Sequence, residues 1–259
     1  MNHCIDFYFF SGTGNTLLVA KRMSEVFQSK GYEVHLKRIE NSMPDDVNTE
    51  CTIGLGFPVA VLSTYDLVWK FIKKLPDVDG TEIFMVDTLG GVSGGIVGPL
   101  RSILESKGYK TIGACEIVMP LNIFYIQDST VNSKKVEEGL LKAENYALSL
   151  INNESEWGHF PVIPNIMRFI SKIGIGITAT SVHQKVLKFK ADKSKCDKCG
   201  ICRDICPTNN IKMEEYPIIG NSCEYCMRCA SLCPFNALVP VFNYHGKTYS
   251  AVKPKEFKS

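Results

Sequence analysis

The last quarter of the chain carries the same spacing of cysteines twice. The pattern C-x-x-C-x-x-C-x-x-x-C-P runs from Cys196 to Pro207 and again from Cys223 to Pro234. The two copies hold eight of the 11 cysteines, and the other three stand apart in the first half of the chain. A secreted disulfide scaffold would need an export signal, which residues 1–6 do not resemble. The spacing therefore predicts a small metal-binding module. Because residues 1–6 do not resemble an export signal, we expect the protein in the reducing cytoplasm.

This spacing favours iron-sulfur clusters as the metal. Three thiolates placed three residues apart can wrap around one cluster, while the fourth cysteine of each copy is carried to the other cluster. Structural zinc sites are the alternative, because C-x-x-C pairs also bind zinc, but zinc does not need three consecutive pairings followed by Cys-Pro. We therefore expect two [4Fe-4S] clusters with crossed ligands. The first would be held by Cys196, Cys199, Cys202 and Cys233, and the second by Cys206, Cys223, Cys226 and Cys229.

Residues 191–240 resemble the bacterial two-cluster ferredoxins on the strength of these two copies. The resemblance implies an α+β ferredoxin-like domain, which we place at residues 191–259. It also implies one-electron transfer at low potential, with no bond-making chemistry at the clusters.

The first 151 residues alternate between strand and helix patterns. Apolar runs predict strands at residues 4–10, 33–39, 52–57, 82–87 and 110–119, and helical periodicity predicts helices at residues 17–31, 65–75, 96–106 and 134–151. This alternation predicts an α/β domain with a doubly wound five-stranded parallel sheet covered on both faces. Residues 152–190 read as a connecting segment. An amphipathic stretch around Phe169 within it is expected to pack between the domains.

A loop rich in glycine and hydroxyl groups follows the first predicted strand. It reads Ser11-Gly12-Thr13-Gly14-Asn15-Thr16 and opens the first predicted helix, where backbone amides and the helix N-terminus favour an anion. No Gly-Lys-Ser/Thr completes a Walker A loop, and Leu17 stands where the dinucleotide fingerprint needs its third glycine. The loop therefore predicts a site for a terminal phosphate monoester, with a ligand-free turn as the alternative.

This hexapeptide and the strand-helix order together resemble the flavodoxins. The resemblance implies a sheet order of 2-1-3-4-5, with FMN at the carboxyl ends of strands one, three and four. Two further loops would then hold the flavin ring: Phe57, Pro58, Val59 and Ala60 after strand three, and Thr88, Leu89, Gly90 and Gly91 after strand four. Flavodoxins commonly stack aromatic rings on the flavin, but only Phe57 and Tyr65 lie near the first loop and no aromatic residue lies in the second. Asn122, Phe124 and Tyr125 are expected near the flavin edge.

Other features carry weaker predictions. Residues 91–95 fit the hydrolase pattern G-x-S-x-G around Ser93, and Asp128 and His159 follow in triad order, but a hydrolase would leave the loop and both cysteine copies unexplained. Cys4, Cys51 and Cys115 fall on predicted strands and are expected to be small core residues. Residues 244–253 are expected to pack as a tail on a neighbouring surface.

The combination resembles the flavodoxin-ferredoxin fusion proteins of anaerobes. The resemblance implies electron transfer between an external redox protein, the two clusters and FMN, without a catalytic acid or base. A flavin-dependent oxidoreductase that reduces a small molecule is the second hypothesis, and a redox sensor is the third.

Charge and hydropathy narrow the possible partners. The 29 basic and 27 acidic residues leave a formal net charge of +2, which does not predict a nucleic-acid binder. The most apolar stretch, residues 163–177, is interrupted by Arg168 and Lys172, so no membrane span is expected.

Overall fold

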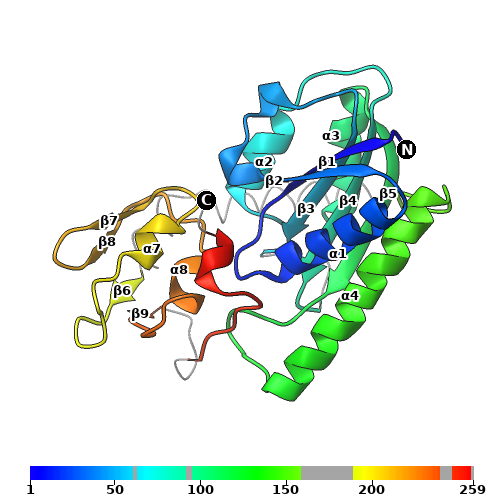
Figure 1. Cartoon of the computed structure of the whole chain (residues 1–259). Coiled ribbons are helices and arrows are strands. Elements are labelled where there is room, and N and C mark those ends of the chain that lie inside the picture. Colours follow the sequence, from blue (N-terminus) through cyan, green and yellow to red (C-terminus); the bar gives the residue numbers. More distant parts are fainter. Residues whose placement is uncertain (61–62, 92–94, 159–188, 240–246, 258–259) are drawn as a thin grey trace.

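The computed structural model describes residues 1–60, 63–91, 95–158, 189–239 and 247–257 (Figure 1). Its first half contains a parallel five-stranded sheet in the order β2-β1-β3-β4-β5, which confirms the predicted fold and strand order. The strands are β1 (Cys4–Phe9), β2 (Glu33–Arg38), β3 (Thr52–Pro58), β4 (Glu82–Leu89) and β5 (Lys110–Val118).

Four helices cover the two faces of this sheet. They are α1 (Asn15–Ser29), α2 (Asp66–Lys73), α3 (Val97–Ser106) and α4 (Ser129–Ile151), and two short 3-10 turns, η1 (Ile39–Asn41) and η2 (Pro44–Asp46), connect β2 to β3. Helices α1 and α4 share one apolar core with Phe7 and Phe9, whereas α2 and α3 share the other with Tyr8 and Phe10. The alternation along β1 and the residue that follows it thus supplies both layers, as expected for a strand buried on both faces.

The second half of the described chain is built from short elements. Strands β6 (Lys190–Ala191) and β9 (Leu238–Val239) pair antiparallel, as do β7 (Ile211–Met213) and β8 (Pro217–Ile219). Helices α7 (Ile201–Asp204) and α8 (Arg228–Ser231) each begin two residues after the second cysteine of a copy. These elements lie beside one end of the large sheet (Figure 1).

The two cysteine copies adopt the same backbone conformation. Positive φ angles occur at matched positions: Lys198 (57°) and Tyr225 (53°), Gly200 (75°) and Met227 (62°), and Asn209 (50°) and Asn236 (48°). Only one of these six is glycine, so the conformation is set by the turn that the motif must make and not by local preference. The sequence duplication is therefore also a structural duplication.

Residues 249–257 return to the first half of the chain and end in the 3-10 turn η4 (Pro254–Phe257). The Ala251 amide donates to the carbonyl of Thr13 at 2.8 Å, and Arg38 donates to the Phe257 carbonyl at 2.9 Å. Lys21 pairs with Glu256 at 2.7 Å. The surface on which this tail packs is thus α1, the loop that precedes it and the end of β2.

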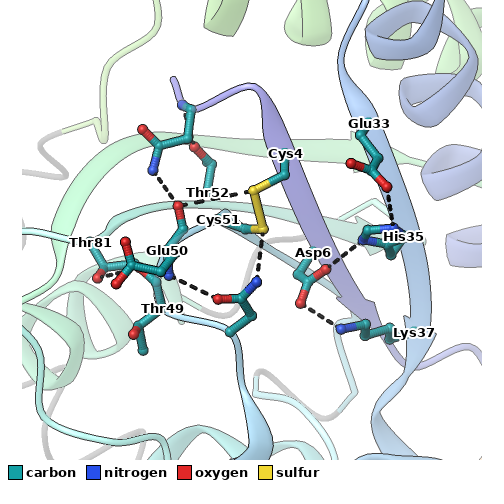
Figure 2. Close-up of a disulfide and its surroundings, with 12 residues drawn as sticks. Cys4, Asp6, Glu33, His35, Lys37, Thr49, Glu50, Cys51, Thr52 and Thr81 are labelled. Atoms are coloured by element: carbon teal, nitrogen blue, oxygen red, sulfur yellow. Dashed lines mark hydrogen bonds and ion pairs between the residues drawn. A yellow bond between two sulfur atoms is a disulfide. The ribbon is translucent and has the colours of Figure 1, made fainter.

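Cys4 and Cys51 form a disulfide, which corrects their interpretation as separate core residues (Figure 2). Cys4 opens β1 and Cys51 directly precedes β3, and because these strands are neighbours in the sheet the two Cα atoms lie 4.9 Å apart. Persistent disulfides are rare in the cytosol, so this bond does not fit the reasoning that placed all the cysteines in a reducing compartment. Cys115 is a free thiol, and burial raises its pKa to about 11.

A buried carboxylate lies close to the disulfide. Asp6 on β1 is 1% exposed and accepts hydrogen bonds from Lys37 at 2.5 Å and from His35 at 3.0 Å, both on β2 (Figure 2). This pairing supports the charge of a carboxylate that would otherwise be costly to bury.

Three expectations fall outside the described residues. The amphipathic stretch around Phe169, and Ser93 and His159 of the hydrolase pattern, belong to residues 92–94 and 159–188. In the part of the chain that the structure describes, no helix combines the length and the apolar character needed to span a membrane.

Candidate cofactor sites

The eight cysteines of the two copies surround two separate cavities. One cavity, here called the outer site, is lined by Cys196, Cys199, Cys202 and Cys233. The other, here called the inner site, is lined by Cys206, Cys223, Cys226 and Cys229. Each cavity therefore takes three cysteines from one copy and the fourth from the other, which is the crossed grouping expected of two-cluster ferredoxins.

The chemistry of both cavities fits an iron-sulfur cluster. Apart from the cysteines, the linings are largely apolar, with Met213, Pro217 and Leu238 at the outer site and Ile211 and Ile219 at the inner site. Among the described residues, no three His, Cys, Asp or Glu side chains meet around one point where a single ion would bind. In a [4Fe-4S] cluster each thiolate binds a different iron, so four cysteines surround a volume instead of meeting at a point.

Backbone amides point at the sulfur atoms in the same way in both copies. Asn210 donates to Sγ of Cys206 at 3.3 Å, and Ala237 donates to Sγ of Cys233 at 3.4 Å. Such N–H···S bonds are among the factors that set cluster potentials. Burial raises the pKa of Cys226 to about 12, so metal binding at the inner site must release protons.

The loop at residues 11–16 has the geometry of an anion site. Gly14 has a φ of 106° and forms the N-cap of α1, and the Ser11 hydroxyl accepts the amides of Gly14 at 3.2 Å and Leu17 at 3.3 Å. Within the described ranges, the amides of four loop residues donate no hydrogen bond to a protein acceptor; these are Gly12, Thr13, Asn15 and Thr16. Free amides at a helix N-terminus suit a phosphate group.

A cavity of about 400 Å³ extends from this loop over the carboxyl ends of β1, β3 and β4. Of the residues expected at the flavin, eleven line it: Ser11, Gly12, Thr13, Asn15, Thr16, Pro58, Val59, Ala60, Thr88, Leu89 and Gly90. Three others do not line it. Phe57 is fully buried in the core beneath, Gly91 is exposed, and Gly14 faces Val252 of the tail.

The loop after β5 completes this side of the cavity. Residues 120–124 line it, including Asn122 and Phe124, whereas Tyr125 is 68% exposed and is not part of the lining. The Asn15 side chain donates to the carbonyl of Pro120 at 2.8 Å, and Asn122 donates to the Thr13 hydroxyl at 3.2 Å. These bonds fix the loop after β5 to residues 11–16.

Comparisons with known proteins address the two halves separately. Residues 189–212 match the family model of the 4Fe-4S binding domain. The chain joins a flavodoxin-like fold to a 4Fe-4S binding domain, and the described residues 189–239, which carry both cysteine copies, are called the ferredoxin domain below. The flavodoxin-like fold rests on the strand order 2-1-3-4-5 of the sheet itself.

Similar solved structures include several flavodoxins. One from the domain Archaea is 14% identical, covers 57% of this chain and 99% of its own, and has a TM-score of 0.42. The two-electron reduced flavodoxin of Megasphaera elsdenii is 25% identical, covers 53% of this chain and 98% of its own, and has a TM-score of 0.40. The Streptococcus pneumonia TIGR4 flavodoxin is 16% identical, covers 57% and 98%, and has a TM-score of 0.45. No curated protein matches the chain.

The ferredoxin domain also lines the cavity of the flavodoxin-like domain, which the sequence analysis did not predict. Cys223, Glu224, Tyr225 and Met227 all line it. At the contact, a Cβ added to Gly12 would lie 2.4 Å from the carbonyl oxygen of Cys226. Gly12 is therefore required for the approach of the two domains, in addition to any role toward an anion.

Arg228 holds the two domains together from between two inner-site cysteines. Its side chain is 3% exposed and donates to the carbonyl of Ser11 at 2.6 Å, to Glu40 at 2.7 Å and to the carbonyl of Ile205 at 3.1 Å. The guanidinium also lies 4.3 Å from the centre of the Phe257 ring. One side chain thus joins the inner site, the loop at residues 11–16, η1 and η4.

Glu224 makes a second contact between the domains. Its carboxylate accepts the Asp66 amide at 3.0 Å, at the N-terminus of α2. The unpaired amides there favour a negative charge, although burial and the nearby Asp66 raise the pKa of Glu224.

Proposed function

We propose that this protein transfers electrons between two [4Fe-4S] clusters and one FMN. The observation that carries the proposal is a shared wall: Cys223, Glu224 and Met227 line both the inner cysteine site and the cavity above the sheet. A cluster and a flavin bound there would be separated by the thickness of one loop. FMN accepts one or two electrons and each cluster carries one, so the two clusters together can supply the two electrons that full reduction of the flavin requires.

The two cysteine sites differ in exposure, and this difference suggests the direction of the path. Cys199 of the outer site is exposed, whereas Cys226 of the inner site is buried against the flavodoxin-like domain. We infer that an external redox protein exchanges electrons at the outer cluster and that the inner cluster connects it to FMN. The role of the chain is to bind these groups, keep water from the inner cluster and fix their spacing.

The residues at the cavity fit FMN in two respects. The free amides of Gly12, Thr13, Asn15 and Thr16 would hold the phosphate, and the largely apolar segments at the ends of β3, β4 and β5 would hold the ring. When bound, FMN supplies the site of one- and two-electron chemistry. A small-molecule reductase remains the competing function, and its substrate would have to reach the ring beside Ala60 and Gly90.

Anaerobic reconstitution followed by analysis of iron, sulfide and flavin tests the proposal. The ligand count predicts about eight irons, eight sulfides and one FMN per chain. Four irons, stoichiometric zinc, or clusters without flavin would contradict it. Steady-state turnover of the reduced protein with quinones and nitro compounds separates the two functions. A carrier follows the driving force of the acceptor, whereas an enzyme favours one chemical structure.

A further inference from the structure

We propose, on the basis of the function above, that residues 223–228 form one wall of the flavin site and that Tyr225 and Met227 contact the flavin ring. We call this segment the inner loop. Because the inner loop also carries ligands of the inner cluster, assembly of that cluster tightens FMN binding.

The composition of the cavity lining first points to the inner loop. Among the described residues that line the cavity, the aromatic side chains are Tyr65, Phe124 and Tyr225. The described residues at the end of β4 and directly after it contribute Thr88, Leu89 and Gly90, none of which is aromatic. The ferredoxin domain thus brings an aromatic ring and a thioether to a cavity whose own loops offer few such groups. Both favour contact with an aromatic ligand.

The two cysteine copies differ at the positions that face the cavity. The outer copy has Lys198 and Gly200 where the inner copy has Tyr225 and Met227, in the same left-handed conformation. Glycine adopts this conformation without strain, whereas methionine does not. The turn of the motif imposes this conformation in both copies, so the inner copy keeps a methionine side chain where a glycine would fit without strain. Met227 is 3% exposed and belongs to the same buried apolar cluster as Phe189.

Contacts with the flavodoxin-like domain fix the position of the inner loop. The Cys226 carbonyl lies against Gly12, Arg228 donates to the Ser11 carbonyl, and Glu224 accepts the Asp66 amide. These contacts occur on both sides of Tyr225, so its backbone is held at the edge of the cavity. The ring of Tyr225 packs on Phe189 at a centroid distance of 6.1 Å and an interplanar angle of 25°.

A physical link between the two cofactors follows from this arrangement. The inner cluster would tie Cys223, Cys226 and Cys229 to one rigid group and so order the inner loop before FMN binds. Ordering a binding surface in advance lowers the entropy lost on binding. The coupling must be reciprocal, so FMN would also stabilise the inner cluster.

Substitutions in the inner loop test the contact. FMN affinity would be measured by flavin fluorescence quenching on the anaerobically reconstituted full chain. We expect Tyr225→Ala and Met227→Gly to weaken FMN binding about tenfold each. Met227→Gly introduces the residue of the outer copy and relieves backbone strain. Tyr216→Ala is the matched control, because Tyr216 lies under Lys193 and Lys198 and does not line the cavity.

A matched pair of cysteine variants tests the coupling. Cys229 and Cys202 hold equivalent positions in the two copies, and neither lines the flavin cavity. We expect Cys229→Ser to weaken FMN binding about tenfold, within the usual range of coupling, and Cys202→Ser to leave it within twofold.

The outcomes separate this inference from the function on which it rests. If the unmodified protein takes up clusters but no FMN, the proposed function is wrong. If it binds FMN and Tyr225→Ala, Met227→Gly and Cys229→Ser all bind it within twofold of the unmodified protein, only the inner-loop proposal is wrong. Should Cys229→Ser fail to fold, the Tyr225 and Met227 variants decide the contact, and slower loss of the inner cluster on adding FMN decides the coupling.

Discussion

The buried pair of Arg228 and Glu40 offers a direct test of how the two domains are held together. The side chains are 3% and 5% exposed, and their charged atoms lie 2.7 Å apart. Replacing Arg228 by Met keeps an unbranched side chain between the rings of Phe10 and Phe257, but it removes the charge and all three hydrogen bonds. The perturbation therefore acts on the ionic contact and spares most of the apolar one.

The size of the effect follows from burial. Removing one partner of a buried ion pair leaves the other charge uncompensated and costs about 3–5 kcal/mol. In a protein of this size each kcal/mol lowers the Tm by about 2–4 °C, so Arg228→Met should lower it by roughly 6–20 °C. Combining Arg228→Met with Glu40→Gln leaves neither charge buried, so the double variant should melt above Arg228→Met alone.

Scanning calorimetry of the anaerobic, cofactor-loaded protein at one fixed scan rate would measure these shifts. Lys134→Met is the matched control, because Lys134 and Glu138 form an exposed pair at 3.8 Å whose loss should change the Tm by less than about 2 °C. An Arg228→Met variant that melts within 2 °C of the unmodified protein would refute the argument. A double variant less stable than Arg228→Met would refute its electrostatic part.

Three further predictions concern other parts of the chain. Thr13→Asp should weaken FMN binding about 100-fold or more, because the new carboxylate repels the phosphate. Thr13→Asn introduces a side chain of the same size as Asp without the charge, so its effect in the same fluorescence titration should be far smaller. Cys51→Ser should lower the free energy of unfolding by up to about 4 kcal/mol, because the bond to Cys4 spans a separation of 47 residues; identical urea curves for variant and unmodified protein without reductant would contradict this. Burial, with the nearby charge of Glu116, raises the pKa of Asp87, whose oxygens have no hydrogen-bond partner in the described residues. The unfolded chain then loses this proton at a lower pH than the folded one, so stability falls as pH rises above about 4. Asp87→Asn should remove that fall, so the Tm of the variant relative to the unmodified protein should increase between pH 5 and pH 7. A Tm difference that stays constant or shrinks over this range would contradict the prediction.

The sheet and its helices could be predicted because their signals are local. The apolar runs, the helical spacing and the loop at residues 11–16 each lie within a few neighbouring residues, and their order leads to a doubly wound sheet. One helix boundary was predicted wrongly: α4 begins at Ser129 and not at residue 134. Ser and Thr have low preference for helix interiors, so Ser129 and Thr130 gave no helical signal in the sequence. The duplicated spacing predicts two groups of four cysteines, and in the structure each of these groups lines one cavity.

The wall of the candidate flavin site could not be predicted, because it depends on contacts between distant parts of the chain. Arg228 and Ser11 are 217 residues apart, and Glu224 and Asp66 are 158 apart. The sequence around Arg228 and Glu224 does not indicate which distant residues their side chains contact. The Cys4–Cys51 bond was missed for the same reason, since only the pairing of β1 with β3 brings the two residues together.

The packing of the tail on the loop at residues 11–16 has a consequence for how the protein is made. Ser250 donates to the Thr13 carbonyl and Tyr249 donates to the side chain of Asn15, across separations of 237 and 234 residues. At a synthesis rate of roughly 5–20 residues per second, the loop leaves the ribosome about 10–50 s before these partners are made. The hydrogen bonds from Tyr249 and Ser250 form only after both cysteine copies have been translated. The loop of the nascent flavodoxin-like domain therefore lacks two of its native contacts until the ferredoxin domain and the tail have been translated.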